Sequence, residues 1–266
     1  LTILLPSVVP KLSSLTPLAA IPALLASMFL NAQQTQASWL FFGSEFSIDE
    51  TSRLMMFLAA SLWLICGVYS LIYLSAGKPR KHFFCYFNLA MSGSFGLILS
   101  QDLFGFITFF TLMSLASYGL ILHDKTLQAR IAGTSYIRWV ITGEILLFTA
   151  FCLLYGLHDH TPFKPASYHT ALSLLLMVGF GIKMGLLGLH FWLPKAHPAA
   201  PIPASAILSG LMVKSGLIGM IKFMPSEPSY DLVTANSLII IGLTGSSSRY
   251  LCKAPFSNTL KIIFSR

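Results

Sequence analysis

Three ionisable side chains lie within long apolar stretches of this sequence: Glu144, Lys183 and Lys214. Each falls near the middle of a run long enough to cross a bilayer, where a charged side chain costs roughly 2.5–3.5 kcal/mol on insertion scales. Three such costs approach the net stability of an ordinary domain, about 5–15 kcal/mol. They therefore require a structural or a chemical explanation.

Two explanations are open. In the first, Glu144 and one lysine form an ion pair that holds helices together, which leaves the other lysine as an uncompensated buried charge. In the second, the three residues form a proton relay along a hydrated path. Burial disfavours a charged ammonium, whereas a carboxylate at about 5 Å favours it by roughly 3 kcal/mol at an effective dielectric near 20. Because movement of the carboxylate would make a lysine hold or release its proton, we favour the relay.

Neighbouring residues extend this hypothesis. His190 lies seven residues after Lys183, on the same face if the helix runs unbroken, and is our candidate for a bridge in the relay. Lys195 and His197 lie in a basic loop and are candidates for proton entry, although a role in setting the topology explains them equally well. No CxxC pair occurs among the four cysteines, so we predict no metal site.

Two further patterns lie on the predicted helices. Thr108, Thr111 and Ser114 recur at steps of three and would line a water path, but hydroxyls that bond back to their own helix are an equal alternative. Gly185 and Gly188 follow Lys183 closely. They indicate either close helix packing or a discontinuous helix whose freed carbonyls face the ammonium group.

The composition is that of an integral membrane protein. Of the 266 residues, 55% are hydrophobic and 10% are charged, with a mean hydropathy of +0.74, whereas soluble domains carry about 25% charged residues. The net charge of +8 would suggest a nucleic-acid partner in a soluble protein. Here the basic residues gather in short loops between apolar runs, so we expect no nucleic acid and interpret the charge as a signal of orientation.

The apolar runs predict an all-α polytopic transmembrane bundle, since each run approaches the length of a bilayer span and none alternates as a strand would. We expect helices near residues 14–31, 52–76, 82–100, 103–122, 134–157, 169–193, 204–224 and 235–252. Lys and Arg fall mainly in one set of alternate loops and Asp and Glu mainly in the other. The positive-inside rule then places the chain end on the cytoplasmic or matrix side of a bacterial inner membrane or an energy-transducing organelle membrane.

One long stretch, LHFWLPKAHPAAPIPASAILSGLMVKSG at 189–216, resembles the signature of the antiporter-like proton-channel subunits. These subunits occur in respiratory complex I, in Mrp-type cation/proton antiporters and in membrane-bound hydrogenases. The resemblance extends to QDLFGF at 101–106, FFTLMSLASYGLILHD at 109–124 and GEILL at 143–147. The likeness is strongest to the B-type membrane proteins of hydrogenase-4.

The resemblance implies a fold built from inverted units of five helices, each of which offers one half-channel. It divides a single integral membrane domain, residues 1–266, into a first antiporter-like unit at 80–224 with a discontinuous helix and the start of a truncated second unit at 235–266. The second half-channel is then expected in another antiporter-like chain, or lost by truncation.

The resemblance also assigns residues. Lys183 matches the lysine of the family's discontinuous seventh helix and Lys214 that of the eighth, while His190 lies between them. The position of the family's carboxylate partner is Thr111 here, so we expect Glu144 on the next helix to replace it. The positions of the prolines that break the seventh helix are Gly185 and Gly188.

The implied function is proton translocation as a non-catalytic subunit of a redox-driven complex, of the NADH-quinone oxidoreductase or hydrogenase type. A subunit of a Mrp-type antiporter or of an ion-driven uptake system is the alternative, and a scaffold whose buried charges only join helices is a third. We expect no cofactor in this chain and place redox cofactors in partner subunits of a hetero-oligomeric membrane complex.

Overall fold

The computed structural model describes residues 16–223, except for 31, 38–39, 41–42, 75–79 and 158–169. Its helices are α2 (Ile21–Phe29), α3 (Glu50–Tyr73), α4 (Arg80–Leu99), α5 (Leu103–Ile121), α6 (Leu127–Leu157), α7 (Thr170–Met184), α8 (Leu193–Ala199), α9 (Ile202–Ile207) and α10 (Val213–Phe223), with a π-helical segment, η2 (Leu208–Met212), between the last two. Five helical stretches of the described chain are long and apolar enough to cross a membrane. The prediction of an all-α transmembrane bundle is confirmed. The expected helix at 235–252 and the unit at 235–266 lie outside the described residues.

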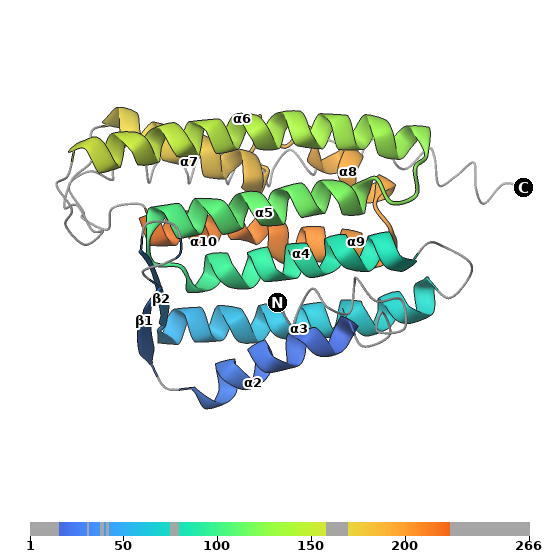
Figure 1. Cartoon of the computed structure of the whole chain (residues 1–266). Coiled ribbons are helices and arrows are strands. Elements are labelled where there is room, and N and C mark those ends of the chain that lie inside the picture. The colour runs from blue at the N-terminus through green and yellow to red at the C-terminus, as the bar shows by residue number, and fades with distance from the viewer. Residues whose placement is uncertain are drawn as a thin grey trace, which may run out of the picture.

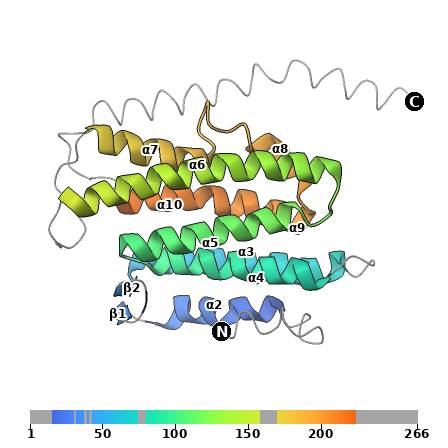
Figure 2. The ribbon, with the colours of Figure 1, turned by 45° about the horizontal axis from the view of Figure 1, so that its top comes forward.

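The helices lie side by side as a layered bundle (Figures 1 and 2). α4 packs on α5, α6 packs on α7, and α10 packs on α7, while α2 and α3 pair at the opposite side of the bundle. Acidic N-caps begin two of the long helices: Asp49 accepts from the Ser52 N–H at 2.7 Å, and Asp102 accepts from the Gly105 N–H at 2.6 Å.

A short β-hairpin joins α2 to α3, in a segment for which we predicted no element. Its strands, β1 (Gln33–Ala37) and β2 (Ser44–Ile48), pair in antiparallel register. We excluded strands only within the apolar runs, and this polar hairpin lies between two of those runs, at the end of the bundle. Asp102 accepts from the Glu45 N–H at 3.0 Å, so the hairpin is tied to the start of α5.

The acidic and basic loops lie at opposite ends of the bundle. Glu45, Asp49 and Asp102 belong to the end that carries the hairpin, and the start of α6 and helix α8, with Arg130 and Lys195, form the other (Figure 1). The alternation of charge along the chain is therefore a separation in space.

Close approach of two helices sets the position of Lys183. A Cβ atom added to Gly143 of α6 would lie 3.2 Å from the Gly179 carbonyl oxygen, and one added to Gly179 of α7 would lie 3.2 Å from the Gly143 carbonyl oxygen. The backbones thus meet where side chains are absent. One turn later, Lys183 enters the space between α5, α6 and α7.

Candidate functional site

Lys183 lies in the last turn of α7 and is only 2% exposed. Its ammonium group donates hydrogen bonds to the Ser114 hydroxyl of α5 at 2.6 Å and to the Tyr136 hydroxyl of α6 at 3.4 Å. It also lies 5.1 Å from the centre of the Phe110 ring and 5.7 Å from that of Tyr136. Two hydroxyl acceptors and two aromatic faces therefore replace the water that a lysine loses on burial.

The hydroxyl protons of this cluster are already committed. Ser114 donates to the carbonyl of Phe110 at 2.7 Å, and Tyr136 donates to the carbonyl of Ser114 at 3.2 Å. Both hydroxyl oxygens consequently present lone pairs to Lys183. The two hydroxyl oxygens can therefore accept hydrogen bonds from a charged ammonium group.

Glu144 lies on α6 and is half-buried, close enough to Lys183 and Tyr136 to interact with both electrostatically. Its Oε1 atom is buried and has no hydrogen-bond partner among the described residues. Among the described residues, Lys183 hydrogen-bonds to the hydroxyls of Ser114 and Tyr136 and not to the carboxylate of Glu144. The structure thus places a carboxylate near the lysine without joining the two in a direct pair.

The chain leaves helical geometry directly after this site. α7 ends at Met184, and Gly185 and Gly188 have φ values of +68° and +85°, in the region that glycine tolerates best. The Trp192 indole N–H donates to the carbonyl of Ile182 at 2.8 Å. The returning segment therefore satisfies the Ile182 carbonyl, while the hydrogen bonds of the Lys183 ammonium to described residues go to hydroxyls.

His190 lies in this returning segment, half-buried, with its ring stacked on Phe191 at 5.4 Å between centres. The condition for a helical face shared with Lys183, an unbroken helix, is not met, because α7 ends at Met184. No hydrogen bond joins the two side chains in the described structure.

Lys214 is exposed on α10, although the sequence led us to expect a buried residue. The π-helical segment Leu208–Met212 precedes it. Such a segment takes up an extra residue per turn and rotates the residues after it by about 100° relative to an unbroken α-helix. The neighbouring Ser215 and Gly216 are buried instead, so the small residues of α10 face the bundle.

Lys195 and His197 occupy α8, at the basic end of the bundle. Lys195 is exposed, and the imidazole Nδ1 of His197 lies 3.1 Å from the Ser205 hydroxyl. Burial lowers the pKa of His197. Neither side chain is hydrogen-bonded to Lys183 in the described part of the chain.

The three hydroxyl residues predicted to line a water path on α5, Thr108, Thr111 and Ser114, have different surroundings. Thr108 donates to the carbonyl of Phe104 at 2.7 Å, and Thr111 is half-buried. Only Ser114 combines a bond to its own helix with a bond to Lys183. Back-bonding therefore accounts for Thr108, and Ser114 is the member that belongs to the lysine cluster.

Two residues of interest escaped the sequence analysis. Tyr136 has the surroundings of a core aromatic, and nothing in its spacing points to Lys183. Lys222 stands near a helix end, where lysines usually reach outward. Instead its ammonium group donates to the carbonyls of Ile98 at 2.6 Å, Ser100 at 2.8 Å and Leu97 at 3.4 Å, and so caps the C-terminal end of α4.

The fold and this site define a polytopic membrane protein with a buried lysine beside a broken helix. Residues 100–246 match the family described as NADH:quinone oxidoreductase/Mrp antiporter, transmembrane. The match covers more than half of the chain, and the chain belongs to this family.

Several proteins of known name are similar. Hydrogenase-4 component B of Escherichia coli is 35% identical over 184 residues, which cover 66% of this chain and 27% of that protein. The D subunit of a Na(+)/H(+) antiporter of Bacillus subtilis is 27% identical over 242 residues, 84% of this chain and 47% of that protein. NAD(P)H-quinone oxidoreductase chain 4-3 of a Nostoc species is 33% identical over 156 residues, 54% of this chain and 27% of that protein.

Solved structures share the fold. A chain of the Mrp complex from a Dietzia species matches with a TM-score of 0.66 and 23% identity, over 80% of this chain and 42% of that one. A chain of an archaeal membrane-bound sulfane sulfur reductase matches with a TM-score of 0.66 and 22% identity, over 80% of this chain and 35% of that one. The chain thus spans less than half the length of each relative named here.

Proposed function

We propose that this chain is a proton-translocating membrane subunit of a redox-driven complex, in which Lys183 holds and releases the transported proton. The observation that carries the proposal is the environment of its ammonium group, which is 2% exposed and hydrogen-bonded to two neutral hydroxyls. A buried lysine with only neutral partners is poised between its charged and uncharged forms. A permanent structural ion pair would instead place a carboxylate in contact with the amine.

Glu144 supplies the switch in this proposal. While its carboxylate is ionised nearby, it favours the charged ammonium of Lys183; once it is protonated or moves away, the neutral amine becomes favourable and the proton leaves. The unpartnered buried Oε1 atom supports this role, because the carboxylate can change its contacts without first breaking a hydrogen bond to a described residue.

The remaining steps involve four residues. His190 bridges toward Lys183 from the returning segment, and Lys195 with His197 provides proton entry at the basic end. Lys214 carries the proton onward. Its exposed position on α10 suits transfer toward a second antiporter-like chain rather than within this one. We place redox cofactors in other subunits of the complex, and the basic end of this chain on the cytoplasmic or matrix side.

The names of the relatives support the redox assignment and also its alternative. Hydrogenase-4 component B and a quinone oxidoreductase chain favour the first, and the Na(+)/H(+) antiporter relative favours a Mrp-type antiporter. Sodium-dependent proton flux in vesicles containing the native complex, without an electron donor, would favour the antiporter. Proton flux that requires an electron donor would favour the redox-driven complex.

Two substitutions of Lys183 test the relay in the native complex. Lys183→Met keeps the apolar stem and removes the proton carrier, while Lys183→Arg keeps the charge but holds its proton at any physiological pH. We expect both variants to assemble and both to lose proton translocation in vesicles. If the lysine only joins helices, Lys183→Arg keeps translocation, and retained flux in either assembled variant would contradict the relay.

A further inference from the structure

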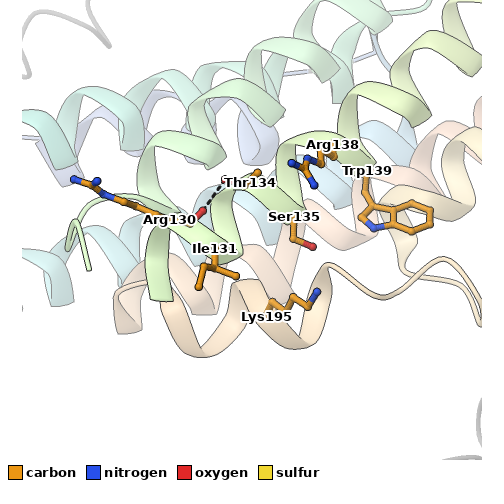
Figure 3. Close-up of a pocket in the computed structure, with 7 residues that line it drawn as sticks. All are labelled: Arg130, Ile131, Thr134, Ser135, Arg138, Trp139 and Lys195. Atoms are coloured by element: carbon orange, nitrogen blue, oxygen red, sulfur yellow. Dashed lines mark hydrogen bonds between the residues drawn. The ribbon is translucent and has the colours of Figure 1, made fainter. Parts of the chain in front are cut away.

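An open pocket of about 490 Å³ lies against α6 and α8 (Figure 3). The start of α6 and helix α8 lie at the end of the bundle away from the hairpin (Figure 1). Three cationic side chains line it: Arg130 and Arg138 from α6, and Lys195 from α8. All three are exposed. None of the described residues that line the pocket is a carboxylate, so the charge of this lining is positive.

The cations have no counter-charge in the described structure. None of the three side chains forms a hydrogen bond or an ion pair with another described residue. Thr134 lies between the two arginines, and its hydroxyl donates to the Arg130 carbonyl at 2.9 Å. Because like charges gathered around one hollow repel each other, the pocket favours an anion with several acceptor oxygens, and arginine suits a phosphate in particular.

The surroundings favour a lipid over a free anion. Along the same helix Leu127, Ile131 and Ile141 are 74%, 57% and 45% exposed, which forms an apolar surface beside the cations. Trp139 lines the pocket and packs on Phe191 at 5.9 Å between ring centres, and tryptophan is enriched at membrane interfaces.

The length of α6 places the pocket at the depth of lipid headgroups. Its apolar stretch has 28 residues, which at 1.5 Å each extends about 42 Å, longer than a hydrocarbon core of about 30 Å. The excess of about 12 Å, when it lies at the N-terminal end, places Arg130 in the headgroup region. Arg138, about two helical turns further along, begins at the edge of the hydrocarbon, and its long side chain can extend back toward the headgroups.

We propose that this pocket binds the phosphate group of an anionic phospholipid. Arg138 and Lys195, which extend from facing elements on the two sides of the pocket, hold the phosphate oxygens (Figure 3). The Arg130 side chain points away from both and attracts the headgroup from the rim (Figure 3). The acyl chains lie on the exposed apolar side of α6, against Trp139. Lys195 thereby gains a role independent of proton entry.

Fluorescence quenching by brominated lipids tests this site. The full chain is reconstituted in phosphatidylcholine vesicles that contain increasing amounts of acyl-brominated phosphatidylglycerol, and the signal of Trp139 is the difference between the parent protein and Trp139→Phe. We expect stronger quenching by brominated phosphatidylglycerol than by brominated phosphatidylcholine. The double variant Arg138→Gln/Lys195→Gln should weaken this preference about 25-fold, roughly fivefold for each cation.

A matched control removes the same charge elsewhere. Arg53→Gln/Lys125→Gln deletes two exposed cations that do not line the pocket, and should leave the preference unchanged. Retained phosphatidylglycerol in native mass spectra of the parent, but not of the pocket variant, would support the site independently. An equal loss in both double variants would overturn the proposal, as would displacement of the lipid by excess inorganic phosphate, which would assign the pocket to free phosphate. Thermal unfolding of the variants checks that they fold.

Discussion

The ammonium of Lys183 donates a 2.6 Å hydrogen bond to the hydroxyl of Ser114, which lies one helical turn beyond Thr111 on α5. Thr111 is the position at which the family resemblance places a carboxylate partner for this lysine. A neutral hydroxyl on the same helix thus contacts the lysine here, and the carboxylate that acts on it electrostatically, Glu144, belongs to α6. The lysine is thus held by neutral acceptors, and the negative charge that acts on it comes from a side chain to which it is not hydrogen-bonded in the described structure.

Removal of the Ser114 hydroxyl should destabilise the protein only while Lys183 is present. We expect Ser114→Ala to lower the free energy of unfolding by about 1.5–3 kcal/mol, because a buried charged group loses a hydrogen-bond acceptor. In a Lys183→Met background the same change should cost clearly less. Thermal unfolding in detergent of the two single variants and the double variant measures this coupling. Equal costs in both backgrounds would mean that the contact contributes nothing.

Glu144→Gln should reduce proton translocation with little effect on folding. The amide keeps the size of the side chain but removes the charge that favours the ammonium form of Lys183, so we expect proton flux to fall at least about tenfold. Because the Oε1 atom has no hydrogen-bond partner in the described structure, the melting temperature should change little. Proton flux in vesicles with the native complex is the measurement. Glu50→Gln, at an exposed position on α3, is the control and should retain full flux.

Lys222 should matter for stability, whereas Lys214 should not. Lys222→Met leaves the carbonyls at the end of α4 without their donor, and we expect a loss of about 2–4 kcal/mol in the free energy of unfolding. Lys214→Met on the same helix removes an exposed side chain and should change it by less than about 0.5 kcal/mol. Thermal unfolding of the two variants in the same detergent compares them directly. Similar losses would show that the carbonyl contacts of Lys222 do not stabilise α4.

Substitutions of Gly188, in the break after α7, should destabilise the protein through the backbone conformation and not through steric clashes. Gly188 has a φ of +85° and nothing within 4 Å of an added Cβ atom, so a side chain fits but the backbone is unfavourable for it. We expect Gly188→Ala to cost about 1–2 kcal/mol, and Gly188→Asn to cost less, because asparagine tolerates positive φ better. The order of the two melting temperatures tests this. A tolerated alanine would mean that the segment adopts negative φ.

Asp49 should make folding sensitive to acid. Partial burial raises the pKa of Asp49, but hydrogen bonds from Ser52 and the charge of Lys222 outweigh this, so that the pKa lies below its usual value. A carboxylate with a lowered pKa in the folded state contributes stability that is present above about pH 4 and lost as the pH falls through the folded-state value. Asparagine at position 49 can still cap α3. We therefore expect Asp49→Asn to reduce the fall in melting temperature that the parent protein shows as the pH is lowered from 7 to 3. If the melting temperature of Asp49→Asn falls with pH as steeply as that of the parent, Asp49 is not a source of the acid sensitivity.

Much of the architecture followed from composition and spacing. Long apolar runs have few alternatives to transmembrane helices, because the bilayer requires every backbone group to be bonded within its own segment. The same reasoning identified Lys183 as an unusual residue and indicated a break at Gly185 and Gly188, since glycine is the residue that a turn with positive φ requires. The family, too, was recognisable from the stretch at 189–216.

The partners of these residues depended on the tertiary structure. Periodicity predicts which residues share a face of one regular helix, but a break after Met184 and a π-helical segment before Lys214 change that phase. His190 consequently lies beyond the helix that carries Lys183, and Lys214 is exposed.

The local sequence identified the buried charge, whereas the packing of three helices decided what that charge contacts. Ser114 and Tyr136 lie 69 and 47 residues from Lys183 in the chain. Only the close approach of α6 to α7 at Gly143 and Gly179 brings that lysine against α6. Contacts of this kind arise from the fit of helix surfaces, which no spacing along a single chain segment encodes.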